Sequence, residues 1–196
     1  MDDLRLRRLA SVVSHLLNPA GLALLVFGML TWRLQEAWVA GAVGALVYAV
    51  VPGGLLVYLH RAGYITDLYP EERHERAGML LVGSLCYFGG VAVLHYVEAP
   101  LPMVLAGCTF GCNALLVWFI NHHWKISIHA VGVGGGVSVL LFSGGASLWP
   151  FLLALPLVAW ARLHLRAHTP AQVTAGLLLG GVSTVILCTL FDGAGP

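Results

Sequence analysis

The segment ARLHLRAHTPAQ, residues 161–172, gathers two arginines and two histidines after a long uncharged run. These four residues are Arg162, His164, Arg166 and His168. A guanidinium binds phosphate oxygens through paired N–H groups, and ionisable groups that cluster at membrane depth usually mark a site. The side chains of this segment therefore predict phosphate chemistry.

The residues that follow predict a helix that begins immediately after His168. Thr169, Pro170 and Gln172 stand at the N-cap, first and third helical positions of a capping box. Proline suits the first helical position because the N–H that it lacks would have no partner there. His168 is therefore expected at a helix N-terminus.

A second helix start is predicted in the segment WKISIHAVG, residues 124–132. Ser127 is a suitable N-cap, which places His129 in the first turn of the helix that follows. Helix N-termini carry free N–H groups and the positive end of the helix dipole, so they favour anions. The basic residues expected around the two helix starts are Arg73, Arg76, Lys125 and Arg162. The sequence therefore predicts a phosphate pocket at the membrane surface.

The composition places these segments in a membrane protein. Of the 196 residues, 59% are hydrophobic and 10% are charged, against roughly 25% charged residues in soluble domains. Continuous apolar runs of about 20 residues predict membrane-spanning helices, because a barrel does not fit such runs. The predicted spans lie near residues 11–32, 38–60, 78–97, 100–120, 128–143, 148–165 and 170–191. The predicted fold class is all-α: one membrane domain over residues 1–196, a helical bundle of about seven transmembrane helices.

Counting the crossings places the basic segments on one face of the membrane. The N-terminus and the loops at residues 61–77, 121–127 and 161–169 are separated by two helices each. Because Lys and Arg mark the cytoplasmic side, the pocket is predicted to face the cytosol. The expected location is a bacterial inner membrane, with the chain as an integral, multi-pass protein. A net charge of +1 gives no reason to expect nucleic acid as a partner.

The spacing of the first segment resembles a signature of the type 2 phosphatidic acid phosphatase superfamily, a family of membrane lipid phosphatases. Arg162, five residues, His168, three residues and Gln172 resemble that family's third signature, which reads Ser-Arg, five residues, His, three residues, Asp. The resemblance covers about residues 60–190. It implies a core of six membrane helices.

The other two signatures of the family have weaker counterparts. Ser127 and His129 stand as in the second signature, Pro-Ser-Gly-His. Arg76, followed by Ala77, is the best counterpart of the first signature, which ends in Arg-Pro. The order of the three signatures agrees with the family.

The resemblance implies a metal-independent phosphatase that needs no cofactor. His168 resembles the nucleophile that forms a phosphohistidine, and His129 the general acid for the leaving group. Arg162 and Arg76 would bind phosphate oxygens, helped by the hydroxyl of Ser127. The implied substrate is drawn from membrane lipids and is either a lipid phosphate or a prenyl diphosphate. A pocket that faces the cytosol favours the prenyl diphosphate.

The sequence also departs from the family. Gln172 stands where the family has the Asp that holds the nucleophile. Its carbonyl can orient the imidazole of His168, or it can serve only in the capping box. The lysine of the first signature is absent, since Tyr69 stands seven residues before Arg76, and Lys125 is the cation that would replace it.

Two other functions remain open from the sequence. A degenerate relative would bind lipid phosphate without cleaving it, which the missing Asp and Lys favour. A membrane di-iron oxygenase would use His122, His123, His164 and His168, although a second histidine box is missing. The sequence also leaves open whether the chain forms a homo-oligomer.

Overall fold

The computed structural model describes residues 2–65 and 73–192, with the backbone alone for residues 2, 73–75 and 192. The helices are α1 (Asp2–Leu16), α2 (Pro19–Leu34), α3 (Trp38–Ala45), α4 (Val51–Arg61), α5 (Arg73–Tyr96), α6 (Leu101–Asn121), α7 (Ile128–Gly144), α8 (Ala154–His164) and α9 (Pro170–Asp192). A π-helical turn (Leu46–Val50) joins α3 to α4, and a 3₁₀ segment (Gly145–Leu153) leads into α8. The predicted all-α fold class is confirmed.

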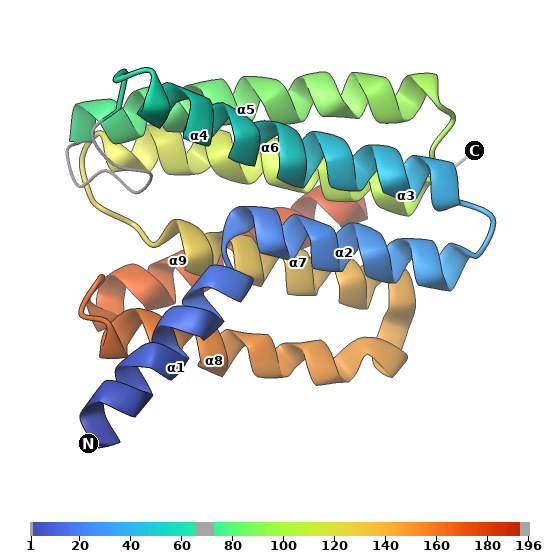
Figure 1. The fold of residues 1–196 in the computed structure, drawn as a ribbon. Coiled ribbons are helices and arrows are strands. Elements are labelled where there is room, and N and C mark those ends of the chain that lie inside the picture. The colour runs from blue at the N-terminus through green and yellow to red at the C-terminus, as the bar shows by residue number, and fades with distance from the viewer. Residues whose placement is uncertain (1, 66–72, 193–196) are drawn as a thin grey trace.

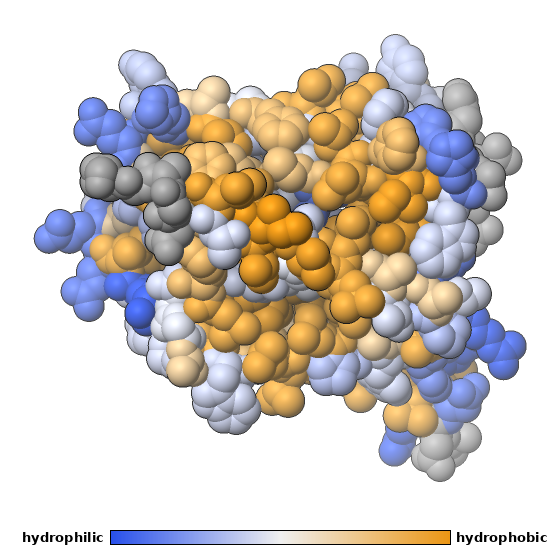
Figure 2. All heavy atoms as spheres, turned by 180° about the vertical axis from the view of Figure 1, so that it is seen from behind, coloured by the Kyte–Doolittle hydropathy of each residue, from blue (hydrophilic) through white to orange (hydrophobic). Residues whose placement is uncertain are grey.

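Five helical stretches of the described residues are long and apolar enough to cross a membrane, or six if the bent pair α1–α2 is one span. They are Trp38–Arg61, Arg76–Tyr96, Leu101–Asn121, Ile128–His164 and Pro170–Phe191. The longest stretch folds back on itself, because α7 and α8 lie side by side (Figure 1). Figure 2 shows apolar residues across the middle of the molecule and hydrophilic residues at two opposite ends. This is the surface of a multi-pass membrane protein.

The connections gather at the two ends of the bundle (Figure 1). One end holds the N-terminus, the end of α4, the α6–α7 connection and the α8–α9 connection. The opposite end holds the α2–α3, α5–α6 and α7–α8 connections. The structure therefore places the predicted basic segments at one end, as counting the crossings required.

The first predicted span, residues 11–32, is wrong as one continuous helix. α1 ends at Leu16 and α2 begins at Pro19, and the two helices differ in direction by 58°. Asn18 is the N-cap of α2, and its Oδ1 accepts the N–H of Gly21 at 2.7 Å. Proline has no N–H to continue a helix, so the chain breaks here. The bend lays α1 against α8 (Figure 1).

Glycines set the most extensive helix contact of the bundle, between α7 and α9. A Cβ on Gly134 would collide with the carbonyl oxygen of Leu177, and one on Gly180 with the carbonyl oxygen of Val131. Neither backbone atom can move aside as a flexible side chain can, so glycine is required for this approach. The contact fixes the distance between two helices that both begin at the predicted phosphate site.

Aromatic rings fill the centre of the bundle between α2, α5 and α6. The ring of Tyr48 stacks on Phe27 with centroids 5.0 Å apart and on Tyr87 at 5.4 Å. Its hydroxyl donates to the carbonyl oxygen of Tyr87 at 2.9 Å. Phe110 packs against the same rings. Tyr87 and Phe110 also line the pocket described below, so this cluster forms part of its apolar wall.

Candidate functional site

A pocket of about 590 Å³ lies between α2, α4, α5, α6 and α7, and reaches α1, α8 and the α8–α9 loop. The basic residues and histidines that line it are His15, Arg76, Lys125, His129, Arg162 and His168. None of the described residues that line it is an Asp or a Glu. Positive groups without a facing carboxylate suit an anionic ligand.

Arg162 is held at the pocket by contacts from two different elements. Its Nη1 donates to the hydroxyl of Ser14 in α1 at 2.7 Å. Its Nη2 lies 3.4 Å from Nδ1 of His168, in the loop between α8 and α9. The two nitrogens of one guanidinium therefore tie α1 to the loop that presents His168.

The contact with Arg162 determines which nitrogen of His168 has a lone pair. A guanidinium has only N–H donors, so Nδ1 of His168 must be the acceptor in this contact. The proton of the neutral ring then lies on Nε2, which is buried and has no hydrogen-bond partner among the described residues. In this arrangement Nδ1 is the nitrogen that can attack an electrophile.

His168 is held in its neutral form. Burial lowers the pKa of His168 to about 3, together with the positive charges of Arg162, Arg76 and Lys125. The imidazole is therefore uncharged at neutral pH, which is the state a nucleophile needs.

Arg76 fixes the α6–α7 connection beside His168. Its side chain is 7% exposed, and its Nη2 donates to the carbonyl oxygen of Ile126 at 2.5 Å. Lys125, the preceding residue of that connection, is half-buried and lines the pocket. The structure thus brings together Arg76, Lys125, Arg162 and His168, which the sequence assigned to one site.

The two predicted helix starts meet, as the sequence indicated. The backbone N–H of Ser127, ahead of α7, donates to the carbonyl oxygen of Gln172 in the first turn of α9 at 3.3 Å. Ser127 caps α7, and its Oγ accepts the N–H of Ala130 at 3.4 Å. Its side chain is fully buried and does not line the pocket. In the structure the hydroxyl of Ser127 serves the cap, and its contact with phosphate stays a prediction.

Gln172 completes the capping box of α9. Its Oε1 accepts the N–H of Thr169 at 3.1 Å, and its own N–H donates to Oγ1 of Thr169 at 3.3 Å. The side-chain carbonyl was the group expected to orient His168. Because that carbonyl is used by the N-cap residue, the structure favours the alternative in which Gln172 is a helix cap.

We expect Gln172→Ala to lower stability and leave catalysis nearly unchanged. Loss of one capping bond should reduce the free energy of unfolding by about 1 kcal/mol, with kcat within about twofold of the wild type. Thermal unfolding in detergent and phosphate release measure the two effects. Gln172→Glu, which keeps an acceptor oxygen, is the control. A fall in kcat of more than about tenfold at unchanged stability would restore the orienting role.

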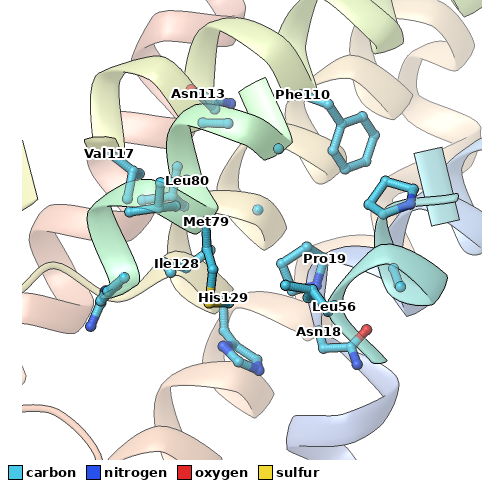
Figure 3. Close-up of a pocket in the computed structure, with 18 of the residues that line it drawn as sticks. Asn18, Pro19, Leu56, Met79, Leu80, Phe110, Asn113, Val117, Ile128 and His129 are labelled. Atoms are coloured by element: carbon cyan, nitrogen blue, oxygen red, sulfur yellow. The ribbon is translucent and has the colours of Figure 1, made fainter. Parts of the chain in front are cut away.

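His129 lies in the first turn of α7, as predicted. Its side chain is 7% exposed and points into the pocket (Figure 3). Asn18 and Pro19, from the break between α1 and α2, lie near it in the same view. His129 and His168 therefore line one pocket from two different helix starts.

The remaining histidines of the sequence analysis lie elsewhere. His164 stacks on Trp160 with centroids 5.6 Å apart, and the ring of His122 packs edge-on against Trp118. Within residues 2–65 and 73–192, no three His, Cys, Asp or Glu side chains come together as metal ligands would. This does not support the di-iron oxygenase. The side chain of Arg73 lies outside the described part of the chain.

Three polar residues from the end of α1 and the start of α2 also line the pocket and were missed from the sequence, namely Ser14, His15 and Asn18. They lie at the bend between α1 and α2. The signal was present, because Asn-Pro at 18–19 has the same N-cap and first-position chemistry as Thr-Pro at 169–170.

Most of the remaining pocket wall is apolar. Leu56 of α4, Met79 and Leu80 of α5 and Val117 of α6 face it (Figure 3). Gly132 of α7 also lines it, together with Gly136. The pocket therefore combines a basic end with an apolar interior, which fits a ligand that has an anionic head and a hydrocarbon tail.

The chain matches no protein-family model, and no curated protein and no solved structure is detectably similar to it.

Proposed function

We propose that this protein is a membrane phosphatase that removes the terminal phosphate from a lipid phosphate or prenyl diphosphate without a metal ion. One observation carries the proposal. A single pocket holds a neutral histidine with an available lone pair, a second histidine and three positive side chains at its basic end, and apolar walls beyond them. These are the parts that phosphoryl transfer to histidine requires.

The reaction uses two histidines in turn. Arg162 moves from Nδ1 of His168 to a phosphate oxygen, and Nδ1 attacks phosphorus. The P–O bond to the leaving group breaks, and the leaving oxygen takes a proton from His129, which must enter this step as the imidazolium. Water then attacks the phosphohistidine and gives a proton back to His129. The P–N bond breaks, which releases inorganic phosphate and the neutral imidazole.

The positive side chains stabilise the charge of this reaction. Arg162, Arg76 and Lys125 border the basic end of the pocket, where negative charge accumulates on the phosphate oxygens. Fixed positive groups in a site that excludes water act strongly on such charge and need no reorganisation during the step. Because no Asp or Glu is among the described residues that line the pocket, this positive charge is not neutralised within it.

Phosphate release by the detergent-purified wild type tests the proposal. The substrates are phosphatidic acid, a monoacyl glycerol phosphate, a prenyl diphosphate and, as a control without a tail, p-nitrophenyl phosphate. We expect release in the presence of EDTA, with kcat/KM at least about tenfold higher for a tailed substrate, since each buried methylene contributes about 0.8 kcal/mol. Loss of release on adding EDTA would contradict a metal-independent reaction.

A second candidate function is binding of lipid phosphate without hydrolysis. Two observations favour it. The side-chain carbonyl of Gln172 accepts from Thr169, and no Asp or Glu among the described residues that line the pocket could stabilise a charged His168. Saturable binding of the same tailed phosphates with no phosphate release would select this function.

We infer that the basic end of the pocket faces the cytosol. α1 carries Arg5, Arg7 and Arg8 at this end, and α4 ends there at Arg61, whereas Arg33 lies in the last turn of α2 at the opposite end. An excess of arginine next to membrane helices marks the cytoplasmic side.

A further inference from the structure

Two polar residues of α6 line the otherwise apolar wall of the pocket. Thr109 and Asn113 are 4% and 5% exposed, and both border the cavity. Figure 3 shows Asn113 on the far side of the pocket from His129, with Met79 and Leu80 between them. A polar group at this depth has no water to satisfy it, so it needs a partner from the protein or the ligand.

Asn113 is only partly satisfied by its neighbours in α9. Its Oδ1 accepts the hydroxyl of Ser183 at 2.6 Å, and its Nδ2 donates to Oγ1 of Thr184 at 3.4 Å. An amide nitrogen has two N–H groups. These contacts use one of them, and the second has no partner among the described residues.

Thr109 differs from other threonines in helices of this protein. Thr31 and Thr189 donate their hydroxyls to carbonyl oxygens of their own helices, at 2.7 Å and 3.0 Å for the bonds four residues back. The buried hydroxyl of Thr109 has no hydrogen-bond partner among the described residues. The hydroxyl of Thr109 therefore makes no hydrogen bond that would stabilise the helix bundle.

The two side chains lie at a defined depth below the phosphate site. A Cβ on Gly135 would lie 2.5 Å from Nδ2 of Asn113 and 3.1 Å from Cγ2 of Thr109. Gly135 follows His129 by six residues on α7, which is about 9 Å along the helix axis. Both side chains therefore lie deeper in the bundle than His129, at the depth that the tail of a ligand with its head beside His129 would reach.

We propose that Thr109 and Asn113 form a subsite for a hydrogen-bond acceptor oxygen in the ligand's tail, and that the pocket selects an ester-linked lipid phosphate over a prenyl phosphate. An ester carbonyl accepts from both donors, whereas a prenyl chain has no oxygen below its phosphate groups and leaves both donors unpaired. The choice of substrate class rests on the proposed phosphate site at the other end of the pocket. It contradicts the preference for prenyl diphosphates that the cytosolic sidedness suggested.

Binding affinity tests this subsite without requiring turnover. The probes are a monoacyl glycerol phosphate and its alkyl ether analogue, which lacks the carbonyl, with a prenyl phosphate as a third ligand. Thr109→Val removes the hydroxyl and keeps the shape. Thr109→Ser keeps the hydroxyl, and Thr189→Val removes a hydroxyl on the exposed side of α9 as a matched control. Each variant is measured in detergent with all three ligands.

We expect the wild type to bind the ester about fivefold to tenfold more tightly than the ether, the scale of one or two neutral hydrogen bonds. Thr109→Val should reduce this ratio to about twofold or less by weakening ester binding alone, while Thr109→Ser and Thr189→Val keep it. Equal affinity of the wild type for ester and ether would overturn the subsite, as would equal weakening of both in Thr109→Val. Binding with this preference but without phosphate release would refute the phosphatase and retain the subsite. Failure of all three ligands to bind would refute both.

Discussion

Replacement of His168 by alanine is expected to abolish phosphate release. In the proposed reaction the imidazole provides the attacking Nδ1, which in the structure lies 3.4 Å from Nη2 of Arg162. Without this nitrogen no phosphohistidine forms, and water must attack phosphorus unaided. Loss of a catalytic nucleophile lowers kcat by on the order of 10³-fold or more. Phosphate release from a tailed substrate in detergent measures this loss.

The matched control for this variant is His164→Ala. His164 lies four residues earlier in α8, where its ring stacks on Trp160, and it does not line the pocket. Its replacement should change kcat by less than about twofold. In the wild type, a phosphoryl group that is labile to acid should be trapped on the protein and should be missing from His168→Ala. Full activity of His168→Ala would show that His168 is not the nucleophile.

Arg162→Lys is expected to lower kcat/KM by about tenfold to a hundredfold. The guanidinium uses one nitrogen on Ser14 and another beside His168, and a lysine ammonium cannot reach both in this fixed geometry. The loss corresponds to one or two hydrogen bonds to a charged group, about 1.5–3 kcal/mol. Arg166→Lys is the control, because Arg166 is exposed and lies outside this pocket. Similar losses in both variants would rule out a special role for Arg162.

The positive charge of Arg162 should also affect how kcat depends on pH. Burial is the first cause of the low pKa of His168, and Arg162 is the second. Arg162→Ala removes that positive charge, so the pKa of His168 should rise from about 3 towards its ordinary value. Because protonated His168 cannot attack, the acid limb of kcat should move to higher pH in Arg162→Ala and stay in place in Arg162→Lys. Titration of the imidazole by NMR measures the pKa directly.

Local chemistry allowed the sequence to predict the helices and the starts of two of them. The apolar runs specify membrane helices because an unpaired backbone cannot stay in lipid. Ser127 at the N-cap of α7 and Thr169 before Pro170 specify helix starts because their oxygens satisfy free N–H groups. The placement of Arg162, His129 and His168 at one end then follows from counting crossings. The Asn18–Pro19 break carries the same signal, although it was missed within an apolar run.

Tertiary structure decided which side chains of the predicted site face the pocket. Ser127 and Gln172 have the residue types of a phosphate site, but their oxygens satisfy backbone N–H groups of their own helix starts. Sequence alone cannot separate these roles, because the same oxygen can cap a helix or contact a ligand.

The contact of Arg162 with Ser14 joins residues 148 positions apart, and it depends on the bend that lays α1 against α8. The position of Thr109 and Asn113 beside Gly135 likewise depends on how closely α6, α7 and α9 approach. Such distances arise from packing between helices, whereas the pattern of residues along one helix determines only which face is apolar. The sequence by itself thus determined the helices and the chemistry at their ends, and the packing decided that Arg162 lies beside His168 and that Thr109 and Asn113 border the pocket.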